Sequence, residues 1–435
     1  MKYTSTRESA APVTLGPAIA AGLAPDGGLY VPERMPQVSP DALDPDAPLA
    51  ELAAAMLAPF FAGDPLREAL PEICAEAFTF PAPVTPLPWA NAGLLELFHG
   101  PTAAFKDFGA RFLAACMRRL QHDVERPLTV LVATSGDTGA AVAAAFHNVP
   151  GMRVCVIYPD GRVSPRQAHQ LGCFGGNVHT LRLDGSFDAC QRLVKQALAD
   201  AGLQSVVPLT SANSISLGRL LPQMTYYAQV ALRHRRDHGE AARFVIPTGN
   251  LGNALACIWA RTVGLPIGDI HLAANANKTL PDYFSGGDYR PRTGVATVAN
   301  AMDIGAPSNF ERLRWLWKGD DATLRRAFGA GSVDDAGIRD TIARLAREHD
   351  TVVCPHTATA MHELGRLRAD GDDRHRYVVA TAHPAKFEQV VEPLVGHDVA
   401  MPPALEALLA RPARAESIGN DYAALRDELT ASMVA

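Results

Sequence analysis

The segment Leu128-Thr-Val-Leu-Val-Ala133, followed by Thr134-Ser-Gly-Asp-Thr-Gly139 and the alanine-rich stretch Ala140–His147, decides the fold. A short apolar and β-branched run is typical of a strand that is covered on both faces. The loop of small polar residues leads directly into a helical stretch. The same pattern recurs where Arg243–Pro247 leads into Thr248–Asn253 and a further helical stretch.

Other apolar runs of similar length lie between helical windows along the chain. We predict further strands at Arg153–Tyr158, Val178–Leu183, Ile270–Ala274 and Tyr377–Ala380, and a helix at Ala254–Val263. Strands that alternate with helices indicate parallel β-α-β units and a doubly wound α/β sheet. Ligands of such sheets bind at the carboxyl ends of the strands, so the loops there are the first place to look for a site.

Four prolines in Phe80–Pro88 interrupt the chain and forbid a continuing helix. Before them, Leu49–Phe61 and Pro65–Phe78 have helical periodicity, which predicts an N-terminal helical domain over residues 1–82. After them, the α/β pattern predicts a catalytic core over residues 83–400. Residues 401–435 are expected to form a short helical tail, with a helix at Ala423–Leu429 as its clearest part.

The composition excludes several classes of function. Lys and Arg number 40 against 46 Asp and Glu, and the net charge of −6 gives no electrostatic footprint for nucleic acid or an anionic membrane. The seven cysteines are never spaced C-x-x-C, which predicts reduced, buried thiols and neither a disulfide framework nor a zinc site. Prolines and glycines break the uncharged stretch Ser9–Pro25, so we do not expect a signal peptide there. We expect a cytoplasmic protein.

Histidine patterns do not predict a metal site. His362 and Glu363 begin like a zinc-protease helix, but the second histidine of that motif is missing. His234 and His238 are four residues apart, yet three arginines lie beside them, which favours a solvated helix end over a metal site. The chain also lacks a G-x-S-x-G elbow and a dinucleotide fingerprint.

The loop Thr248–Asn253 has two glycines and successive backbone N–H groups just before a helix. That arrangement forms an anion nest, and the helix dipole favours a phosphate there. The alternative is a β-α turn in which Thr248 or Asn253 caps the helix.

The loop Ser135–Gly139 is similar but contains the carboxylate of Asp137. Because a carboxylate repels phosphate, this loop suits a ring hydroxyl, an amine or a carboxyl group. The alternative is that Asp137 or Thr138 satisfies orphan N–H groups of the following helix.

A third segment places a lysine at the start of a helix. Phe105, Phe108 and Phe112 repeat at spacings of three and four, which predicts one buried helical stripe, and Lys106 lies in its first turn. The positive end of the helix dipole and a partly apolar setting lower the pKa of an amine, as suits a nucleophilic or Schiff-base lysine. The alternative is a solvated surface lysine.

Seven segments together resemble the threonine synthase family of fold-type II pyridoxal-phosphate enzymes. In chain order they are Asp26–Pro32, His99–Phe108, Ser135–Gly139, Asn213–Ser216 with Arg219, residues 249–253, Ala301–Asp303 and Thr381–Phe387. The resemblance covers nearly the whole chain and implies two α/β subdomains in the catalytic core. It also implies pyridoxal 5'-phosphate as cofactor and the conversion of O-phospho-L-homoserine and water into L-threonine and phosphate.

The resemblance assigns Lys106 as the catalytic residue that holds the cofactor as a Schiff base. The implied cofactor contacts are Ser135, Asp137, Gly249, Asn250, Leu251, Gly252, Asn253 and Thr381. The implied substrate contacts are Thr102, Ser135, Thr138, Ser211, Asn213 and Arg219. Thr381 is expected at the pyridine nitrogen, and Ser211, Asn213 and Arg219 at the γ-phosphate of the substrate.

Two alternatives remain open from the sequence. A serine or threonine dehydratase-like lyase shares the cofactor and the fold, and deamination assays separate it from the first reading. A non-catalytic homologue that acts as a binding protein is disfavoured by the intact Lys106, Thr381 and glycine loop. The expected partner is a small-molecule substrate, with neither nucleic acid nor membrane, on a monomer or homodimer.

Overall fold

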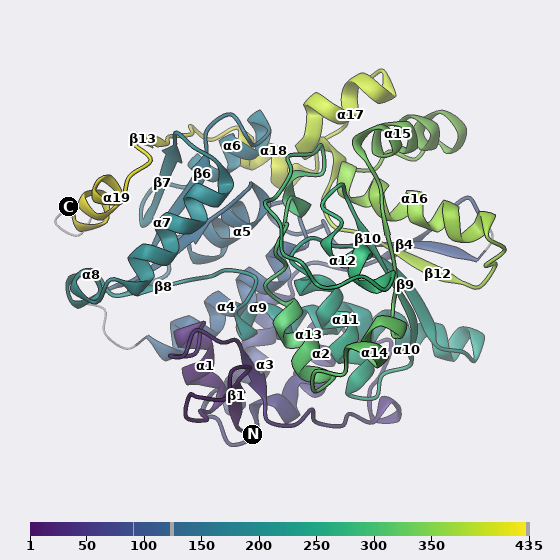
Figure 1. Cartoon of the computed structure of the whole chain (residues 1–435), viewed down its shortest axis with the longest axis horizontal. Helices are drawn as coiled ribbons and strands as arrows, with labels where there is room; N and C mark the ends of the chain where they lie inside the picture. Colours follow the sequence, from purple (N-terminus) through teal and green to yellow (C-terminus); the bar gives the residue numbers. More distant parts are fainter. Residues whose placement is uncertain (90, 122–125, 432–435) are drawn as a thin grey trace.

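The computed structural model describes residues 1–89, 91–121 and 126–431, and two large sheets organise it (Figure 1). The six-stranded sheet has the order β11-β10-β9-β12-β4-β3, the five-stranded sheet the order β13-β7-β6-β5-β8, and β1 pairs with β2 alone. The strands are β1 Tyr3–Ser5, β2 Tyr30–Pro32, β3 Val84–Pro86, β4 Ala92–Glu96, β5 Leu128–Ala133, β6 Met152–Pro159, β7 Val178–Leu183, β8 Leu209–Thr210, β9 Ala242–Pro247, β10 Ile267–Ala274, β11 Gly329–Ser332, β12 Arg376–Ala380 and β13 Glu416–Ile418.

Both large sheets are parallel except at one edge. Among the described strands of these sheets, only β3 runs antiparallel to its neighbour β4. The five-stranded sheet takes β5 to β8 from the part of the chain between β4 and β9, and Figure 1 shows it on the left of the molecule. The prediction of an α/β fold with parallel sheets is therefore confirmed.

Helices surround the two sheets. The α-helices are α1 Leu15–Ala21, α2 Leu49–Leu57, α3 Leu66–Ala77, α4 Lys106–Leu120, α5 Asp137–Phe146, α6 Pro165–Gly172, α7 Phe187–Ala199, α8 Ala201–Val206, α9 Leu217–Leu220, α10 Met224–His238, α11 Gly252–Thr262, α12 Thr279–Phe284, α13 Phe310–Leu316, α14 Asp321–Arg326, α15 Asp335–His349, α16 Pro355–Ala369, α17 Glu388–Val395, α18 Pro403–Leu409 and α19 Tyr422–Ala431. The predicted strands and helices lie within a few residues of these bounds.

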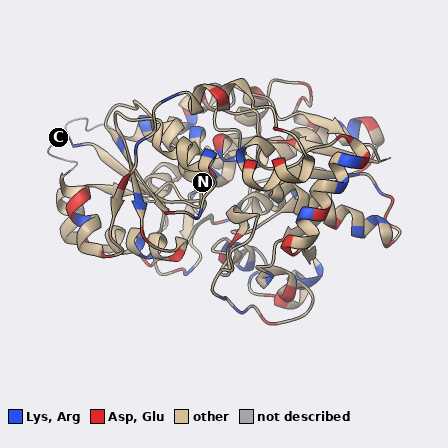
Figure 2. Ribbon diagram, turned by 90° about the horizontal axis from the view of Figure 1, so that it is seen from above, with Lys and Arg blue, Asp and Glu red and all other residues tan. Residues whose placement is uncertain are grey.

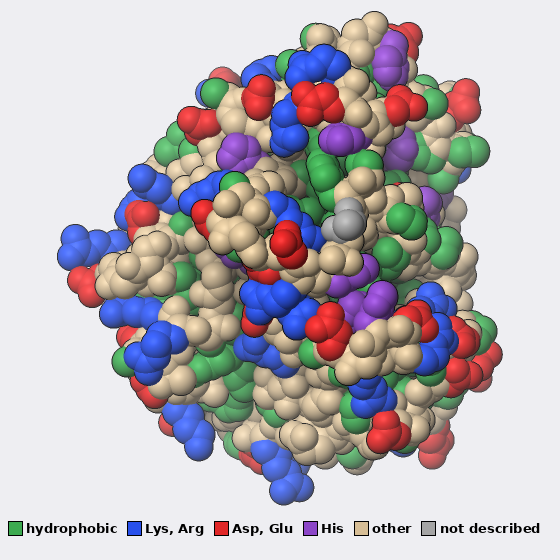
Figure 3. Space-filling view, turned by 90° about the vertical axis from the view of Figure 1, so that its right-hand side faces the viewer, with side chains coloured by type: hydrophobic (Ala, Val, Ile, Leu, Met, Phe, Trp, Pro, Cys, Tyr) green, Lys and Arg blue, Asp and Glu red, His purple; other side chains and the backbone are tan. Residues whose placement is uncertain are grey.

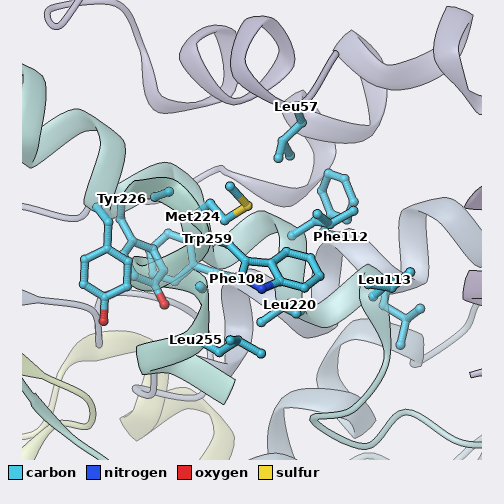
Figure 4. Packing of buried hydrophobic residues seen from close by; sticks show 14 of the residues in the cluster. Leu57, Phe108, Phe112, Leu113, Leu220, Met224, Tyr226, Leu255 and Trp259 are labelled. Carbon is cyan, nitrogen blue, oxygen red and sulfur yellow. The ribbon is translucent and has the colours of Figure 1, made fainter. Parts of the chain in front are cut away.

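One apolar core joins the N-terminal segment to the helix that carries Lys106. The ring of Phe61 meets that of Phe112 on α4 edge-on, with centroids 6.2 Å apart. Phe108 on the same helix packs against Tyr226 on α10, and Trp259 is buried in the same cluster (Figure 4). The predicted phenylalanine stripe is thus the buried face of α4, and it fixes the direction in which the first turn of that helix points.

The tail differs from its prediction. The helices α18 and α19 agree with the predicted helical tail, but β13 between them pairs in parallel with β7, with Ser417 opposite Arg182. The tail therefore extends the five-stranded sheet, and α19 packs against α7. Glu416-Ser-Ile418 contains no apolar run, because an edge strand has one side open to water.

The interpretation of His234 as part of a solvated helix end is wrong. Its side chain lies on α10 and is 1% exposed, although His238 at the end of that helix is exposed. Lys, Arg, Asp and Glu are interspersed over the molecule (Figure 2). Within the described residues, the longest apolar helices fall short of what is needed to cross a bilayer.

Candidate active site

The sequence-predicted loops meet at the carboxyl ends of the strands. Thr381 directly follows β12, the glycine loop (residues 249–253) follows β9, and Ser135 follows β5. Lys106 is the first residue of α4, and residues 97–105 connect that helix to β4. Parallel strands place all these loops on one edge of the sheets, as expected for a doubly wound fold.

Lys106 has the electrostatics of a reactive amine. Burial, followed by the nearby charge of Arg219, lowers the pKa of Lys106 to about 7, although Asp137 opposes the shift. Its Nζ atom lies 4.4 Å from the centroid of the Phe105 ring. A large fraction of this amine is therefore neutral near pH 7, which is the form that attacks a carbonyl.

Backbone hydrogen bonds hold Lys106 beside Thr381. The N–H of Phe105 donates to the carbonyl of Thr381 at 2.8 Å, and the N–H of His383 donates to the carbonyl of Ala103 at 3.0 Å. Ala103 has a φ of 54°, which is an uncommon conformation for a residue with a side chain. Lys106 and Thr381 consequently line the same cavity of about 60 Å³, which we call the inner cavity.

The glycine loop forms another wall of the inner cavity. A Cβ atom at Gly249 would lie 2.7 Å from the Cα of Met302, so only glycine fits there. Leu251 has a φ of 64° and turns the chain into α11. The side chain of Asn250 donates to Ser214 Oγ at 2.7 Å and accepts from the N–H of Ser308.

The N–H groups of this loop have no partners. Within the described part of the chain, none of the backbone N–H groups from Gly249 to Asn253 donates a hydrogen bond. Asn253 instead accepts from the hydroxyls of Tyr226 and Tyr227 at 2.6 and 2.9 Å. Unpaired N–H groups at a helix N-terminus bind anions, which favours the anion-nest interpretation over a simple capped turn.

A buried ion pair fixes the loop after β5. Asp137 Oδ1 accepts from Lys386 Nζ at 2.9 Å and from Gln167 Nε2 at 3.0 Å. Lys386 also donates to the carbonyl of Thr102 at 2.7 Å. Burial raises the pKa of the Asp137 carboxyl, but the charges of Lys386 and His356 and the hydrogen bonds from Lys386 and Gln167 together hold the pKa below its usual value. Asp137 is therefore a charged anchor, and its carboxylate points at Lys386.

A second cavity of about 240 Å³, which we call the outer cavity, shares Lys106 with the inner one. Four predicted substrate contacts line it: Ser135, Thr138, Ser211 and Asn213. Lys195 and Arg292 lie in the same wall and bring positive charge to it. Sequence reasoning missed both, because they lie in ordinary helix and loop sequence without a motif.

Arg219 lines the inner cavity with the glycine loop, apart from Ser211 and Asn213. It is 1% exposed, its Nη1 atom donates to the carbonyl of Ala212 at 2.8 Å, and its buried Nε atom has no hydrogen-bond partner among the described residues. Burial lowers the pKa of Arg219 to about 10, although Asp107 opposes the shift. A buried cation without a paired carboxylate needs an anion nearby.

Thr102 lies behind the catalytic wall. Its hydroxyl donates to Asp107 Oδ1 at 2.7 Å, and it is absent from the described residues that line the two cavities. Sequence reasoning also missed His356, a buried neighbour of Asp137 that lines the inner cavity. Burial lowers the pKa of His356 to about 4, so its imidazole is neutral at pH 7.

The residues fit pyridoxal phosphate. Its aldehyde needs a neutral amine, which Lys106 provides, and its phosphate needs the orphan N–H groups of residues 249–253. Thr381 would hold the pyridine nitrogen from the opposite wall. Because Gly249 has no side chain, its backbone can pack against the Met302 backbone and form the narrow loop that a phosphate site requires.

Comparisons with known proteins agree with this geometry. The family model described as pyridoxal-phosphate dependent enzyme matches residues 81–384, and the fold and site define a fold-type II pyridoxal-phosphate enzyme. Models of the threonine synthase N-terminus and C-terminal region match residues 2–78 and 357–428. The chain belongs to the threonine synthase family.

Individual relatives cover almost the whole chain. A threonine synthase from Haemophilus influenzae is 38% identical over 422 residues, which is 97% of each chain. The crystal structure of threonine synthase from Escherichia coli has a TM-score of 0.91 and 36% identity, and the match covers 99% of this chain and 100% of the other. A threonine synthase from Brucella melitensis with bound pyridoxal phosphate matches with a TM-score of 0.90 and 33% identity, over 100% of both chains.

Proposed function

We propose that this chain converts O-phospho-L-homoserine and water into L-threonine and phosphate. The observation that carries the proposal is the position of Lys106. Its amine, with a pKa of about 7, joins an inner cavity built for a bound phosphate to an outer cavity lined by hydroxyls and amides. Pyridoxal phosphate, when bound, supplies an electron-withdrawing ring conjugated to the substrate nitrogen, which acidifies the substrate Cα–H.

Lys106 moves the protons. Its Nζ atom takes the proton from the substrate Cα and, later in the cycle, returns a proton to carbon. A pKa near the working pH lets one amine act as base and then as acid. His356 nearby is neutral and buried, so it adds no positive charge that would depress the basicity of Lys106 further.

The loop after β5 binds the substrate carboxylate in this proposal. In the described chain, the N–H groups of Ser135, Asp137 and Thr138 donate no hydrogen bond, whereas those of Gly136 and Gly139 donate to Thr134 Oγ1. Asp137 contributes its N–H, because its carboxylate is held by Lys386. The Ser135 and Thr138 hydroxyls complete this wall.

The substrate phosphate lies between Ser211, Asn213 and Arg219 in this proposal. The phosphate dianion takes the charge-assisted hydrogen bonds that the unpartnered Arg219 Nε can donate. The Ser211 hydroxyl is also buried without a partner, which supports an anion there. All of these residues come from one chain, so we propose that the enzyme works as a monomer or a homodimer.

The test follows both products with the enzyme loaded with pyridoxal phosphate. We expect phosphate and threonine in equal amounts from O-phospho-L-homoserine, and no keto acid from L-serine or L-threonine. Lys106→Ala should lower turnover by at least about 10⁴-fold, whereas Lys2→Ala, an exposed control, should leave it unchanged.

Chemical trapping tests the assignment of the lysine independently. Borohydride reduction followed by peptide mapping should place the label on Lys106. Lys386 is the competing amine in the site, but it is 0% exposed and bonded to both Asp137 and Thr102. A label on Lys386, or keto acid formation from serine without phosphate release, would overturn the proposal.

A further inference from the structure

Three histidines meet where α10 ends and β12 begins. His234 and His238 lie on α10, His375 directly precedes β12, and one ligand atom from each lies within 4.8 Å of the other two. We call these three residues the histidine cluster. On the side of the molecule that carries these elements, Figure 3 shows adjoining histidine side chains at the surface.

The nitrogens of the cluster are ready for a ligand. His234 is 1% exposed, and its Nδ1 atom is bonded to the Tyr377 hydroxyl at 2.9 Å. Among the described residues, the buried Nε2 atom of His375 has no hydrogen-bond partner, and the buried Nε2 atom of His234 has only Glu240 nearby, at 3.6 Å, beyond hydrogen-bond distance. A buried polar atom without a partner destabilises the folded state. Two such atoms on neighbouring imidazoles indicate a site for a bound ligand, such as a metal ion.

The charges around the cluster permit a cation. Glu240 Oε1 lies 3.6 Å from His234 Nε2, and the other oxygen of Glu240 binds Arg243 at 3.1 Å. Arg368 donates to the carbonyls of Arg374 and Asn91, at 3.0 and 2.7 Å. Arg243 and Arg368 are therefore engaged with oxygen atoms.

We propose that the histidine cluster binds a divalent transition-metal ion of the Zn²⁺ class, and that the exposed side chain of Glu240, which lies outside the cluster, turns toward the ion as the fourth ligand. Imidazole nitrogens and one carboxylate are ligands that Zn²⁺ accepts in tetrahedral geometry. Zn–N bonds of about 2.0 Å place ligand nitrogens about 3.3 Å apart. Ligand atoms that now lie within 4.8 Å of one another therefore approach by up to about 1.5 Å on binding. The bond from His234 to Tyr377 orients the first ligand, as outer-shell partners of metal sites do.

This site is structural. His375 and Thr381 flank opposite ends of β12, which puts the cluster about 20 Å from the catalytic edge. The metal joins the C-terminal end of α10 to the start of a central strand. It therefore stabilises the six-stranded sheet and takes no part in the reaction.

The experiment titrates Zn²⁺ into untagged holoenzyme that has been dialysed against a chelator, in competition with a chromophoric indicator. We expect one equivalent of tight binding and a thermal midpoint that rises by at least about 2 °C at saturation. His238→Gln and His375→Gln should each weaken binding at least tenfold and abolish the thermal shift. His397→Gln, an exposed histidine elsewhere, is the matched control and should change neither.

The visible spectrum of the Co²⁺-substituted protein gives a second readout, because tetrahedral nitrogen ligation produces intense absorption. His238 is exposed, so His238→Gln keeps the test valid even if the partly buried His375 variant does not fold. Wild-type protein that binds no equivalent of metal, or variants that bind it as tightly as wild type, would overturn the proposal.

Discussion

The loop after β5 and the loop after β9 occupy equivalent positions, each between a parallel strand and a helix N-terminus at the catalytic edge. The first is anchored by a side-chain charge, because Asp137 binds Lys386 in a fully buried pair. The second is anchored by backbone shape, with Gly249 pressed against Met302 and Leu251 at positive φ. Two loops of similar sequence pattern are thus held by different physical means.

The difference follows from what each loop binds in the proposed function. A loop that receives a phosphate must keep its N–H groups free and its walls close, so glycines and carbonyl contacts shape it. A loop that receives a carboxylate and hydroxyls tolerates a neighbouring carboxylate, provided that a cation neutralises it. Charge changes should therefore damage the loop after β5, and changes in volume should damage the loop after β9.

Breaking the ion pair should have the largest effect on stability. Lys386→Met leaves the Asp137 carboxylate buried without its cation, and we expect the free energy of unfolding to fall by about 3–5 kcal/mol. Urea unfolding of the apoenzyme measures it. Adding Asp137→Asn to this variant should recover part of the loss, because the buried charge is then gone. Simple additivity of the two changes would show that the pair does not anchor the loop.

Substitution of Arg219 tests whether the inner cavity binds only the cofactor phosphate or also the substrate phosphate. Arg219→Ala should cost about 2–4 kcal/mol in transition-state stabilisation, measured as kcat/KM for O-phospho-L-homoserine. Pyridoxal-phosphate affinity should be unchanged. If cofactor affinity falls while the turnover of loaded enzyme stays near normal, Arg219 serves the cofactor phosphate instead.

One added methyl group tests the loop after β9. Gly249→Ala places a carbon within 2.7 Å of Met302 backbone, and we expect pyridoxal-phosphate affinity to fall by about tenfold, corresponding to about 1.4 kcal/mol. Gly365→Ala, on α16 and outside both cavities, is the control, because a Cβ there meets nothing within 4 Å. Equal losses in both variants would contradict the shape argument. Equilibrium dialysis of the apoenzyme with the cofactor gives both affinities.

The smallest expected effect is the pH dependence of the rate at which Lys106 reacts with pyridoxal phosphate. Because the pKa of Lys106 is lowered to about 7, its neutral fraction rises through neutral pH and not through pH 10.5. The rate at which apoenzyme reacts with pyridoxal phosphate should rise about tenfold from pH 6 to pH 8 and level off above that. A rate that keeps rising about tenfold for each pH unit up to pH 10 would place the pKa of Lys106 near its ordinary value.

The sequence predicted the elements that carry a strong local pattern. Leu128–Ala133 and Val178–Leu183 are strands with the predicted bounds. The first is apolar except for Thr129, and the second buries Val178, Leu181 and Leu183. The sequence did not predict the edge strands Gly329–Ser332 and Glu416–Ile418. Edge strands are held by pairing with one neighbour and need no apolar run. The interior strand β4 was also not predicted, so local pattern specifies most covered strands and leaves edges undetermined.

The site was predictable in its motifs but not in its network. Lys106, the glycine loop and Thr381 stand out by residue type at strand ends. Lys386 does not, because its role depends on reaching Asp137 across the fold. His234 was misplaced for the same reason: arginines beside it in sequence point elsewhere, while His375 reaches it from another strand. Buried polar partners come from distant segments, and no local pattern encodes them.

The pairing of β4 with β12 has a consequence for how the enzyme is made. The five-stranded sheet takes β5 to β8 from one stretch of chain, so most of it can form while translation continues. The inner cavity cannot, since Lys106 and Thr381 both line it and Thr381 is made near the end of the chain. Lys106 therefore leaves the ribosome long before its surroundings exist, and it becomes a reactive amine only when the last central strand closes the sheet.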